Sequence, residues 1–364
     1  MVLMPNKKRY IGLETRITTR GIVAVPCYLI FANNNLIKEV NVPNPVIAEV
    51  TRGGIVESRH TGAFCVVDGE GRVLKSAGDI EAPVFPRSAI KAFQCVPLIE
   101  SGAADHFGFS EEELALACAS HSGEAAHVHV ARSMLKKAQN KEDQYECGAH
   151  WPVEIEAHHQ AVKDGGKALQ IHNNCSGKHA GMLALARQLG ADPKDYVKID
   201  HPVQRAIAKA IAGYCDVDVA KLAWGIDGCS VPTWAFPLRN MALGFARLTE
   251  TPAGIRITAA VRNHPFMVAG TGRFDTRLMQ AVPRAFIKVG AEGVYCGCVP
   301  HAGLGIAVKC DDGAGRAAET AMAEVLASLD VWTDDEKQKL TELTKSELTN
   351  WNKLSVGEIH AVVA

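Results

Sequence analysis

Strand-like segments stand at both ends of this sequence, and helical patterns fill the middle. Near the start, TGAFCVVDGEGRVLKSAGD contains two β-rich runs around the turn Asp68-Gly-Glu-Gly71, a pattern typical of a hairpin. Beyond Lys288, GVYCGCVPHAGLGIAVKCDDGAG contains two more such runs, linked at residues 300–303. These positions predict an antiparallel sheet built from both chain ends and covered by a helical middle, an α/β fold of the α+β type.

Helical periodicity is clear in several middle segments. SAIKAFQCVPLIESG places Ser88 where a helix N-cap is expected, and SEEELALACASHSGE predicts a helix that begins near Ser110. SGKHAGMLALARQLG and HPVQRAIAKAIAGYC are periodic throughout, and RAAETAMAEVLASL predicts a terminal helix. A chain of 364 residues allows one large domain or two tightly associated lobes.

Composition limits the partners and the compartment. A hydrophobic fraction of 47% and a net charge of -1, without a basic stripe, predict a globular protein that does not bind nucleic acid. The 11 cysteines are scattered through apolar runs, which favours reduced thiols and the cytoplasm. The apolar segment 21–32 is too short to cross a membrane and contains Pro26, so no membrane association is expected. Export by a signal peptide is the alternative.

The stretch FPRSAIKAFQ contains a possible nucleophile and base. Spacing of three on a helix puts Ser88 and Lys91 on one face, where the amine can take the hydroxyl proton. The pattern is common, and taken alone it is more often an N-cap serine with a solvated lysine.

Two further stretches favour the catalytic interpretation. Ser120-His-Ser122 follows an apolar helix, and Lys288-Val-Gly290 stands before the first late strand. Ser-x-x-Lys, Ser-x-polar and Lys-x-Gly in this order follow the sequence logic of class A β-lactamases and penicillin-binding proteins. Ser122 replaces the usual Asn and Val289 the usual Thr or Ser, which disfavours antibiotic chemistry. Two lysines in one pocket would oppose each other's charging, as a catalytic amine requires.

A third set combines thiols with other donors. NNCSGKHAG carries Cys175, Lys178 and His179, and GIDGCSVP carries Asp227 and Cys229. Thiolates with His or Asp suit zinc, whereas the absence of a CxxC pair allows two buried structural thiols instead.

Arg52 and His60 in TRGGIVESRHTG are candidates for holding a substrate carboxylate. The alternative is that Arg52 is a surface arginine and His60 is a hydrogen-bonded histidine at a strand end. HPFMVAGTGRFDT has a glycine pair without the Gly-Lys-Ser/Thr of a phosphate loop, and it predicts a tight turn.

Seven stretches together resemble the asparaginase II family of the Rhizobium etli type, also called class 3 asparaginases. They are EVTRGGIVESRHTGAFCVVDGEGRV, FPRSAIKAFQ, CASHSGE, NNCSGKHAGMLA, GIDGCSVPTWAFPL, GTGRFDT and KVGAEGVYCG. The resemblance covers roughly residues 46–328. It implies a fold like that of serine β-lactamases and penicillin-binding proteins, and hydrolysis of L-asparagine to L-aspartate and ammonia. It also implies a homodimer.

The resemblance also implies roles for single residues. Ser88 matches the nucleophile and Lys91 its partner, and Ser120 with Lys288 matches a second Ser-Lys pair. The remaining match is a zinc site of Cys175, Lys178 and Cys229, with Asp227 and His179 beside it. Independently of the resemblance, we consider as substrate contacts Arg52, His60, Ser122, His179 and Asp227.

Three segments are expected: an N-terminal extension over 1–45, one catalytic domain over 46–330 and a helical tail over 331–364. The alternatives to an asparaginase are a serine β-lactam or D-alanyl peptide hydrolase, and a non-catalytic module that binds zinc or an amino acid.

Overall fold

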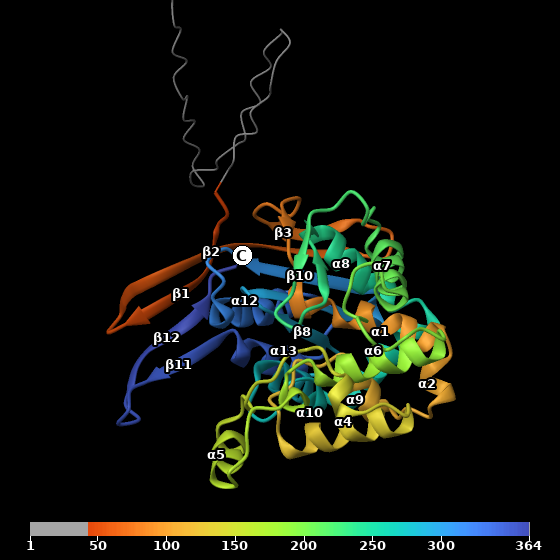
Figure 1. Ribbon diagram of the computed structural model, residues 1–364. Helices are drawn as coiled ribbons and strands as arrows, with labels where there is room; N and C mark the ends of the chain where they lie inside the picture. The colour runs from red at the N-terminus through yellow and green to blue at the C-terminus, as the bar shows by residue number, and fades with distance from the viewer. Residues whose placement is uncertain (1–42, 364) are drawn as a thin grey trace, which may run out of the picture. The chain divides into compact units, whose positions relative to one another are not determined.

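The computed structural model describes residues 43–363, and its main feature is one antiparallel sheet (Figure 1). The strands of this sheet are β1 (Val46–Arg52), β2 (Ile55–Asp68), β3 (Val73–Ala77), β8 (Phe286–Gly290), β9 (Val294–Val299), β10 (Leu304–Cys310), β11 (Lys345–Thr349) and β12 (Ser355–Ala361). Their order is β11-β12-β1-β2-β10-β9-β8, and β3 pairs with β2. Ala48 lies opposite Ala361, so both chain ends build one sheet, and the predicted α/β architecture is confirmed.

Helices fill the middle of the chain and cover the sheet. The longer ones are α1 (Lys91–Glu100), α4 (Ala125–Lys137), α5 (Ile155–Lys163), α6 (Ser176–Gln188), α7 (Pro202–Cys215), α8 (Leu238–Leu248), α9 (Pro252–Asn263), α11 (Phe274–Ala281), α12 (Gly315–Ala327) and α13 (Asp334–Leu343). Helix α8 packs against β2, β9 and β10, and α12 packs against β1, β10 and β12. Every residue of β9 is buried, because helices cover both faces of the sheet there.

Shorter elements connect these parts. They are α2 (Ala103–His106), α3 (Glu111–Ala117), α10 (Pro265–Val268), the 3-10 turns η1 (Arg87–Ile90), η2 (Glu142–Gln144), η3 (Gln170–His172) and η4 (Pro300–Ala302), and the strands β4 (Pro83–Val84), β5 (Trp224–Ile226), β6 (Pro232–Trp234) and β7 (Phe236–Pro237). Helix α3 begins after Ser110, whose side chain forms a capping box with Glu113, as the sequence predicted.

Ser88 is not the N-cap that the sequence predicted. It lies inside η1, which follows Pro86, and the α-helical pattern begins only at Lys91. The two prolines at 83 and 86 hold the approach extended, and a tight turn then precedes the helix. Ser88 is therefore presented on a turn before the helix proper.

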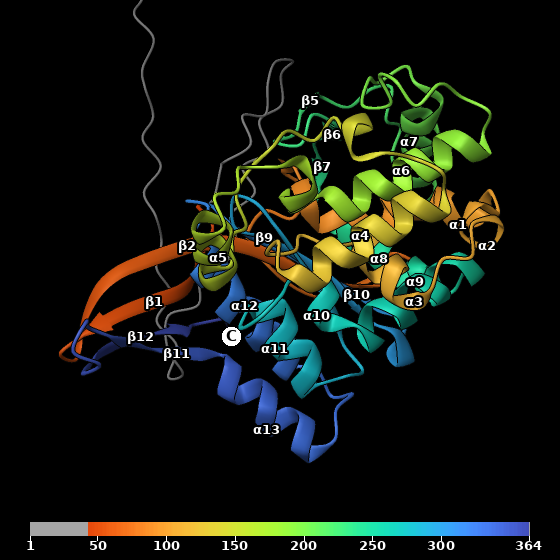
Figure 2. The same ribbon diagram turned by 60° about the horizontal axis from the view of Figure 1, so that its bottom comes forward.

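The prediction of a helical tail over 331–364 was wrong in part. Helix α13 is followed by two strands, and β12 pairs with β1 while β11 pairs with β12. In Figure 2 these strands lie beside β1 and β2 and extend away from the helices. Strand β12 does not show the usual alternation of buried and exposed side chains, because only Ile359 in it is fully buried. Its sequence therefore gives a weak strand signal.

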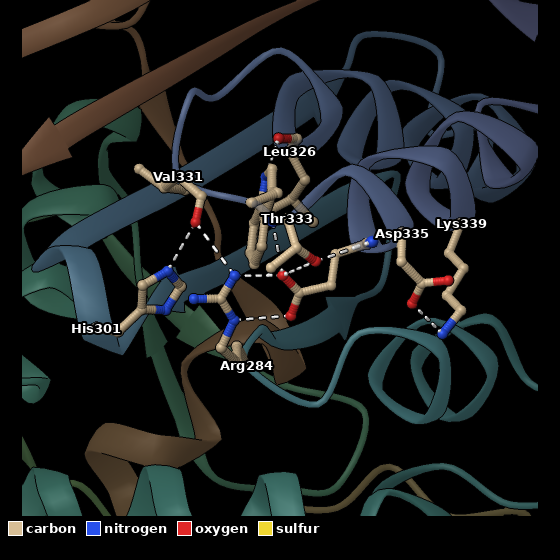
Figure 3. A network of polar contacts seen from close by, with 9 residues as sticks. Arg284, His301, Leu326, Val331, Thr333, Asp335 and Lys339 are labelled. Atoms are coloured by element: carbon tan, nitrogen blue, oxygen red, sulfur yellow. Dashed lines mark hydrogen bonds and ion pairs between the residues drawn. The ribbon is translucent and has the colours of Figure 1, made fainter.

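Polar contacts fasten the start of this C-terminal segment to the sheet (Figure 3). Arg284, which precedes β8, binds Glu336 of α13 through Nε at 2.7 Å. The Arg284 guanidinium also lies over the ring of Trp332, 5.7 Å from its centre. Residues 331–343 are thus part of the folded body.

The ten cysteines within residues 43–363 are all free and buried, as the composition predicted. In the same part of the chain, none of the helices combines the length and the apolar character needed to cross a membrane. The predicted extension over 1–45 and the apolar segment 21–32 lie wholly or mostly outside the described residues.

Candidate active site

Lys91 projects from the first residue of α1 into the interior. It is fully buried, and its backbone N–H donates to the carbonyl of Ser88. Its Nζ donates to the carbonyl oxygen of Ala119 and to Oγ of Ser120, the latter at 3.0 Å. The spacing of Ser88 and Lys91 therefore places both at the same turn, while the lysine amine is hydrogen-bonded to the second serine.

Ser120 lies between the two predicted lysines. Its backbone N–H donates to Val268, which holds the segment after α3 against α10. Its Oγ accepts a hydrogen bond from Nζ of Lys288 at 2.8 Å as well as the one from Lys91. A helix, a loop and a strand that are distant in sequence thus bring Lys91, Ser120 and Lys288 into one buried chain of contacts.

Lys288 lies within β8, whereas the sequence predicted it just before the strand. It pairs with Cys296 of β9 and is fully buried. Burial lowers the pKa of Lys288 to about 7, and the nearby charges of Lys91 and Arg273 contribute to this shift. Near neutral pH its amine can therefore either accept or donate a proton.

Asp275 opposes this shift, and sequence reasoning missed it. Its carboxylate raises the pKa of Lys288, and it accepts hydrogen bonds from the N–H of Val289 and the hydroxyl of Tyr295. It is completely buried in α11. The sequence offered no direct signal for Asp275, because its burial becomes visible only in the fold. An acidic residue seldom enters a core without a partner.

The end of β8 packs directly on the η1 turn. A Cβ placed on Gly290 would lie 2.5 Å from the carbonyl oxygen of Pro86 and 3.2 Å from the backbone nitrogen of Ala89. Only glycine allows this approach, so the end of β8 lies directly against the turn that carries Ser88.

Arg87 is a second residue that sequence reasoning missed. It adopts φ +52 in the turn, directly before Ser88, and its Nε lies 2.5 Å from Oδ1 of Asp227. Although burial raises the pKa of Asp227, Lys178 and Arg87 lower it on balance. The ion pair joins the turn that carries Ser88 to the loop that carries Cys229.

Cys175, Lys178 and Cys229 come together as the sequence predicted. All three are buried, and Nζ of Lys178 lies 2.8 Å from Sγ of Cys229. The hydrogen bond from Cys229 lowers the pKa of Cys175 against the effect of burial, and the cations of Lys91 and Lys178 add to it. Burial lowers the pKa of Lys178, but the charges of Cys229 and Cys175 raise it on balance, so its amine is protonated here. The two thiols and this amine suit a transition metal once the amine has lost its proton.

His179 and Ser122 already have protein partners. Nδ1 of His179 lies 2.6 Å from the hydroxyl of Tyr196, and its Nε2 has no hydrogen-bond partner within residues 43–363. Burial and the charge of Lys178 lower the pKa of His179 well below its usual value. Ser122 donates its hydroxyl to the carbonyl of Ala269.

Arg52 and His60 are not brought to this site. Arg52 lies at the exposed tip of the β1–β2 hairpin in an ion pair with Glu57. His60 lies against Asp312 and, with Cys310, forms a group that could hold a metal ion. Both residues stand in β1 and β2 rather than in the loops near Ser88, which spacing along the sequence could not reveal.

The comparison with protein families gives one match. The family model for L-asparaginase II matches residues 48–361. No curated protein sequence matches. The chain therefore belongs to the L-asparaginase II family, as its motifs predicted, and membership indicates a general amidohydrolase role.

Several solved structures are similar at low sequence identity. A beta-lactamase from Mycobacterium bovis has 11% identity and a TM-score of 0.32, over 78% of this chain and 95% of that one. A D-alanine carboxypeptidase, AmpC, from Burkholderia cenocepacia has 14% identity and a TM-score of 0.37, over 74% and 93%. A simvastatin synthase mutant from Aspergillus terreus has 8% identity and a TM-score of 0.32, over 69% and 86%. All three TM-scores are low, so family membership rests on the family model.

Proposed function

We propose that this protein is an L-asparaginase that hydrolyses L-asparagine to L-aspartate and ammonia through an acyl-enzyme on Ser88. The observation that carries the proposal is the hydroxyl of Ser120 held between the amines of Lys91 and Lys288. Family membership supports the amide substrate. This buried chain of lysine, serine and lysine is suited to moving a proton between the nucleophile and the leaving group.

In the proposed acylation, Oγ of Ser88 attacks the side-chain amide carbon, and the amine of Lys91 accepts the hydroxyl proton. Backbone N–H groups where η1 meets β8 stabilise the oxyanion. Ser120 passes a proton from Lys288 to the leaving nitrogen as the C–N bond breaks and ammonia departs. Water then attacks the ester and gives a proton through Ser120 back to Lys288, while Lys91 returns its proton to Ser88 as the ester bond breaks and aspartate is released.

Substrate binding is assigned to the residues around Arg87. Its guanidinium, next to Ser88, offers donors to the substrate carboxylate, and Asp227 is placed to hold the substrate ammonium. His179 and Ser122 are further proposed substrate contacts, and each is buried and bonded to Tyr196 or Ala269 in the structure. Cys175, Lys178 and Cys229 would hold zinc, which when bound supplies a positive charge that orients the substrate. Lys178 must release its proton to serve as a ligand. A homodimer and a cytoplasmic location complete the proposal.

Ammonia release from asparagine and from glutamine, with and without added zinc, tests the reaction. Ser88→Ala should fold and lose turnover completely, whereas Ser133→Ala, which changes a serine bonded to Glu113, should behave as the wild type. Ser120→Ala should lower turnover by roughly 10²–10⁴-fold. Hydrolysis of nitrocefin without ammonia release from asparagine would contradict the proposal, as would unchanged turnover in Ser88→Ala.

A further inference from the structure

A second group of metal-ligating side chains lies outside the candidate active site. His60 comes from β2, Cys310 ends β10, and Asp312 stands in the turn that follows. Cys310 pairs with Gly62 in the sheet, which brings the three residues to one corner. One donor atom from each lies within 4.8 Å of the others. We propose that His60, Cys310 and Asp312 bind a divalent transition-metal ion of the zinc type, separately from Cys175, Lys178 and Cys229.

The three donors match this class of ion in kind and in spacing. Imidazole nitrogen, thiolate sulfur and carboxylate oxygen are the ligands of zinc, at about 2.0–2.3 Å from the metal, so donors of a tetrahedral site lie roughly 3.5 Å apart. Nδ1 of His60 lies 2.6 Å from Oδ2 of Asp312, and Sγ of Cys310 lies 3.0 Å from Oδ1 of the same aspartate. Small side-chain rotations convert these contacts into a coordination shell.

Burial favours a ligand role for His60. The imidazole is almost completely buried, and within residues 43–363 its Nε2 has no hydrogen-bond partner. Its polar contact is the one that Nδ1 makes with Asp312. The side chain of Asp312 is 51% exposed, so the same corner opens to solvent. An ion can enter there, and water can complete a shell of three protein ligands.

The surrounding backbone orients the donors before any ion binds. Asp312 accepts the N–H of Ala314, and the neighbouring Asp311 donates its own N–H to the carbonyl of Thr61. Such contacts fix ligands in place in metal sites. A bound ion would join β2, near the base of the exposed hairpin, to the turn before α12. We therefore assign the site a structural role.

Titration of the full-length protein with Co²⁺ tests this site. Cys229→Ser removes a donor of the other group and serves as the background. We expect it to bind one Co²⁺ per chain with a sulfur-to-cobalt charge-transfer band. Adding Cys310→Ser should abolish the band, and adding His60→Gln or Asp312→Asn should weaken binding at least tenfold. Adding Asp311→Asn, the matched control next to the site, should leave the affinity unchanged.

The proposal is overturned if Cys229→Ser binds no Co²⁺, if Cys310→Ser keeps the band, or if Asp311→Asn weakens binding as much as Asp312→Asn. Circular dichroism checks that each variant folds. Because Asp312 is exposed, its variant decides the question if the buried Cys310 variant does not fold. Asparagine hydrolysis is not read out, so failure of the proposed reaction would not affect this result.

Discussion

The carboxylate of Asp275 accepts a hydrogen bond at 2.9 Å from the N–H of Val289, the residue that follows Lys288. One buried side chain therefore fixes the strand position of Lys288 and supplies negative charge near its amine. The same carboxylate binds the hydroxyl of Tyr295 through its other oxygen. In the proposed mechanism Asp275 is a positioning residue, since it acts through Lys288.

Replacing Asp275 with asparagine should move the activity profile along the pH axis. Asparagine keeps an oxygen for the N–H of Val289 but removes the charge that raises the pKa of Lys288. The pKa of Lys288 then falls below its present value of about 7, and the limb of kcat/KM that reports it moves to lower pH. Rate measurements across pH 5–9, a range of about four units around this pKa, would detect the shift.

Tyr295→Phe is the matched control for this change. It removes a hydrogen bond to Asp275 and leaves the charge in place. The limb of its kcat/KM profile against pH should move less than the same limb in Asp275→Asn. An equal shift in both variants would show that hydrogen bonding, rather than charge, sets the titration of Lys288.

Lys288→Met should abolish turnover and change how stability depends on pH. The pKa of Lys288 is lowered from 10.5 to about 7 on folding, mainly by burial, so between these values the unfolded chain binds the extra proton. Stability must then rise with pH in this window, by up to ~1.4 kcal/mol per pH unit from this group. Below pH 7 Lys288 is protonated in both the folded and the unfolded state. The folded state is then destabilised by the full cost of burying this cation.

Urea unfolding at pH 7, 8 and 9 measures this dependence. The wild type should gain stability over this range from Lys288, and Lys288→Met should lose that gain. Lys339→Met changes a lysine on the exposed side of α13 and should retain it. The interpretation fails if the wild type and Lys288→Met give parallel curves.

Gly290→Ala should impair activity more than stability. The added methyl group would lie 2.5 Å from the carbonyl oxygen of Pro86, so β8 and the η1 turn must separate. Separation displaces the backbone N–H groups proposed to hold the oxyanion, and loss of one such group lowers kcat by about 10²–10³-fold. Steady-state kinetics would show a fall in kcat. Gly315→Ala, where nothing lies within 4 Å of the new Cβ, should be kinetically silent.

Arg284→Ala should loosen the C-terminal segment. It removes the contacts to Glu336 and the packing over Trp332, so the free energy of unfolding should fall. Lys339→Ala breaks the exposed pair with Asp335 in the same network and should lower stability less than Arg284→Ala does. Urea denaturation of both variants measures their free energies of unfolding. Equal losses of stability in the two variants would contradict this role of Arg284.

The sequence predicted the helices α1, α3, α6, α7 and α12 and two strand pairs of the central sheet, because their local patterns are strong. It did not predict β11 and β12, since they are half-exposed strands and their pairing with β1 depends on contacts over the whole chain. Ser88 was misplaced as an N-cap because the 3-10 turn before α1 arises from the packing of η1 on β8.

Within the candidate site, the sequence motifs identified the residue types, and the fold determined their partners. The contact of Ser120 with both lysines joins segments 168 positions apart, which no local pattern encodes. Arg87 and Asp275 were missed because each acts through a partner in another motif. His60 was recognised as a functional candidate, but its neighbours Cys310 and Asp312 lie at the other end of the chain.

The pairing of β1 with β12 has a consequence for biosynthesis. Val50 meets Ile359, so the seam of the sheet cannot close until residue 359 has left the ribosome. Until then the edge of β1 stays open to other chains, while the helices between residues 91 and 281 can already assemble from local contacts. A premature stop before residue 345 would remove β11 and β12 and leave the edge of β1 unpaired, so the product would be prone to aggregation.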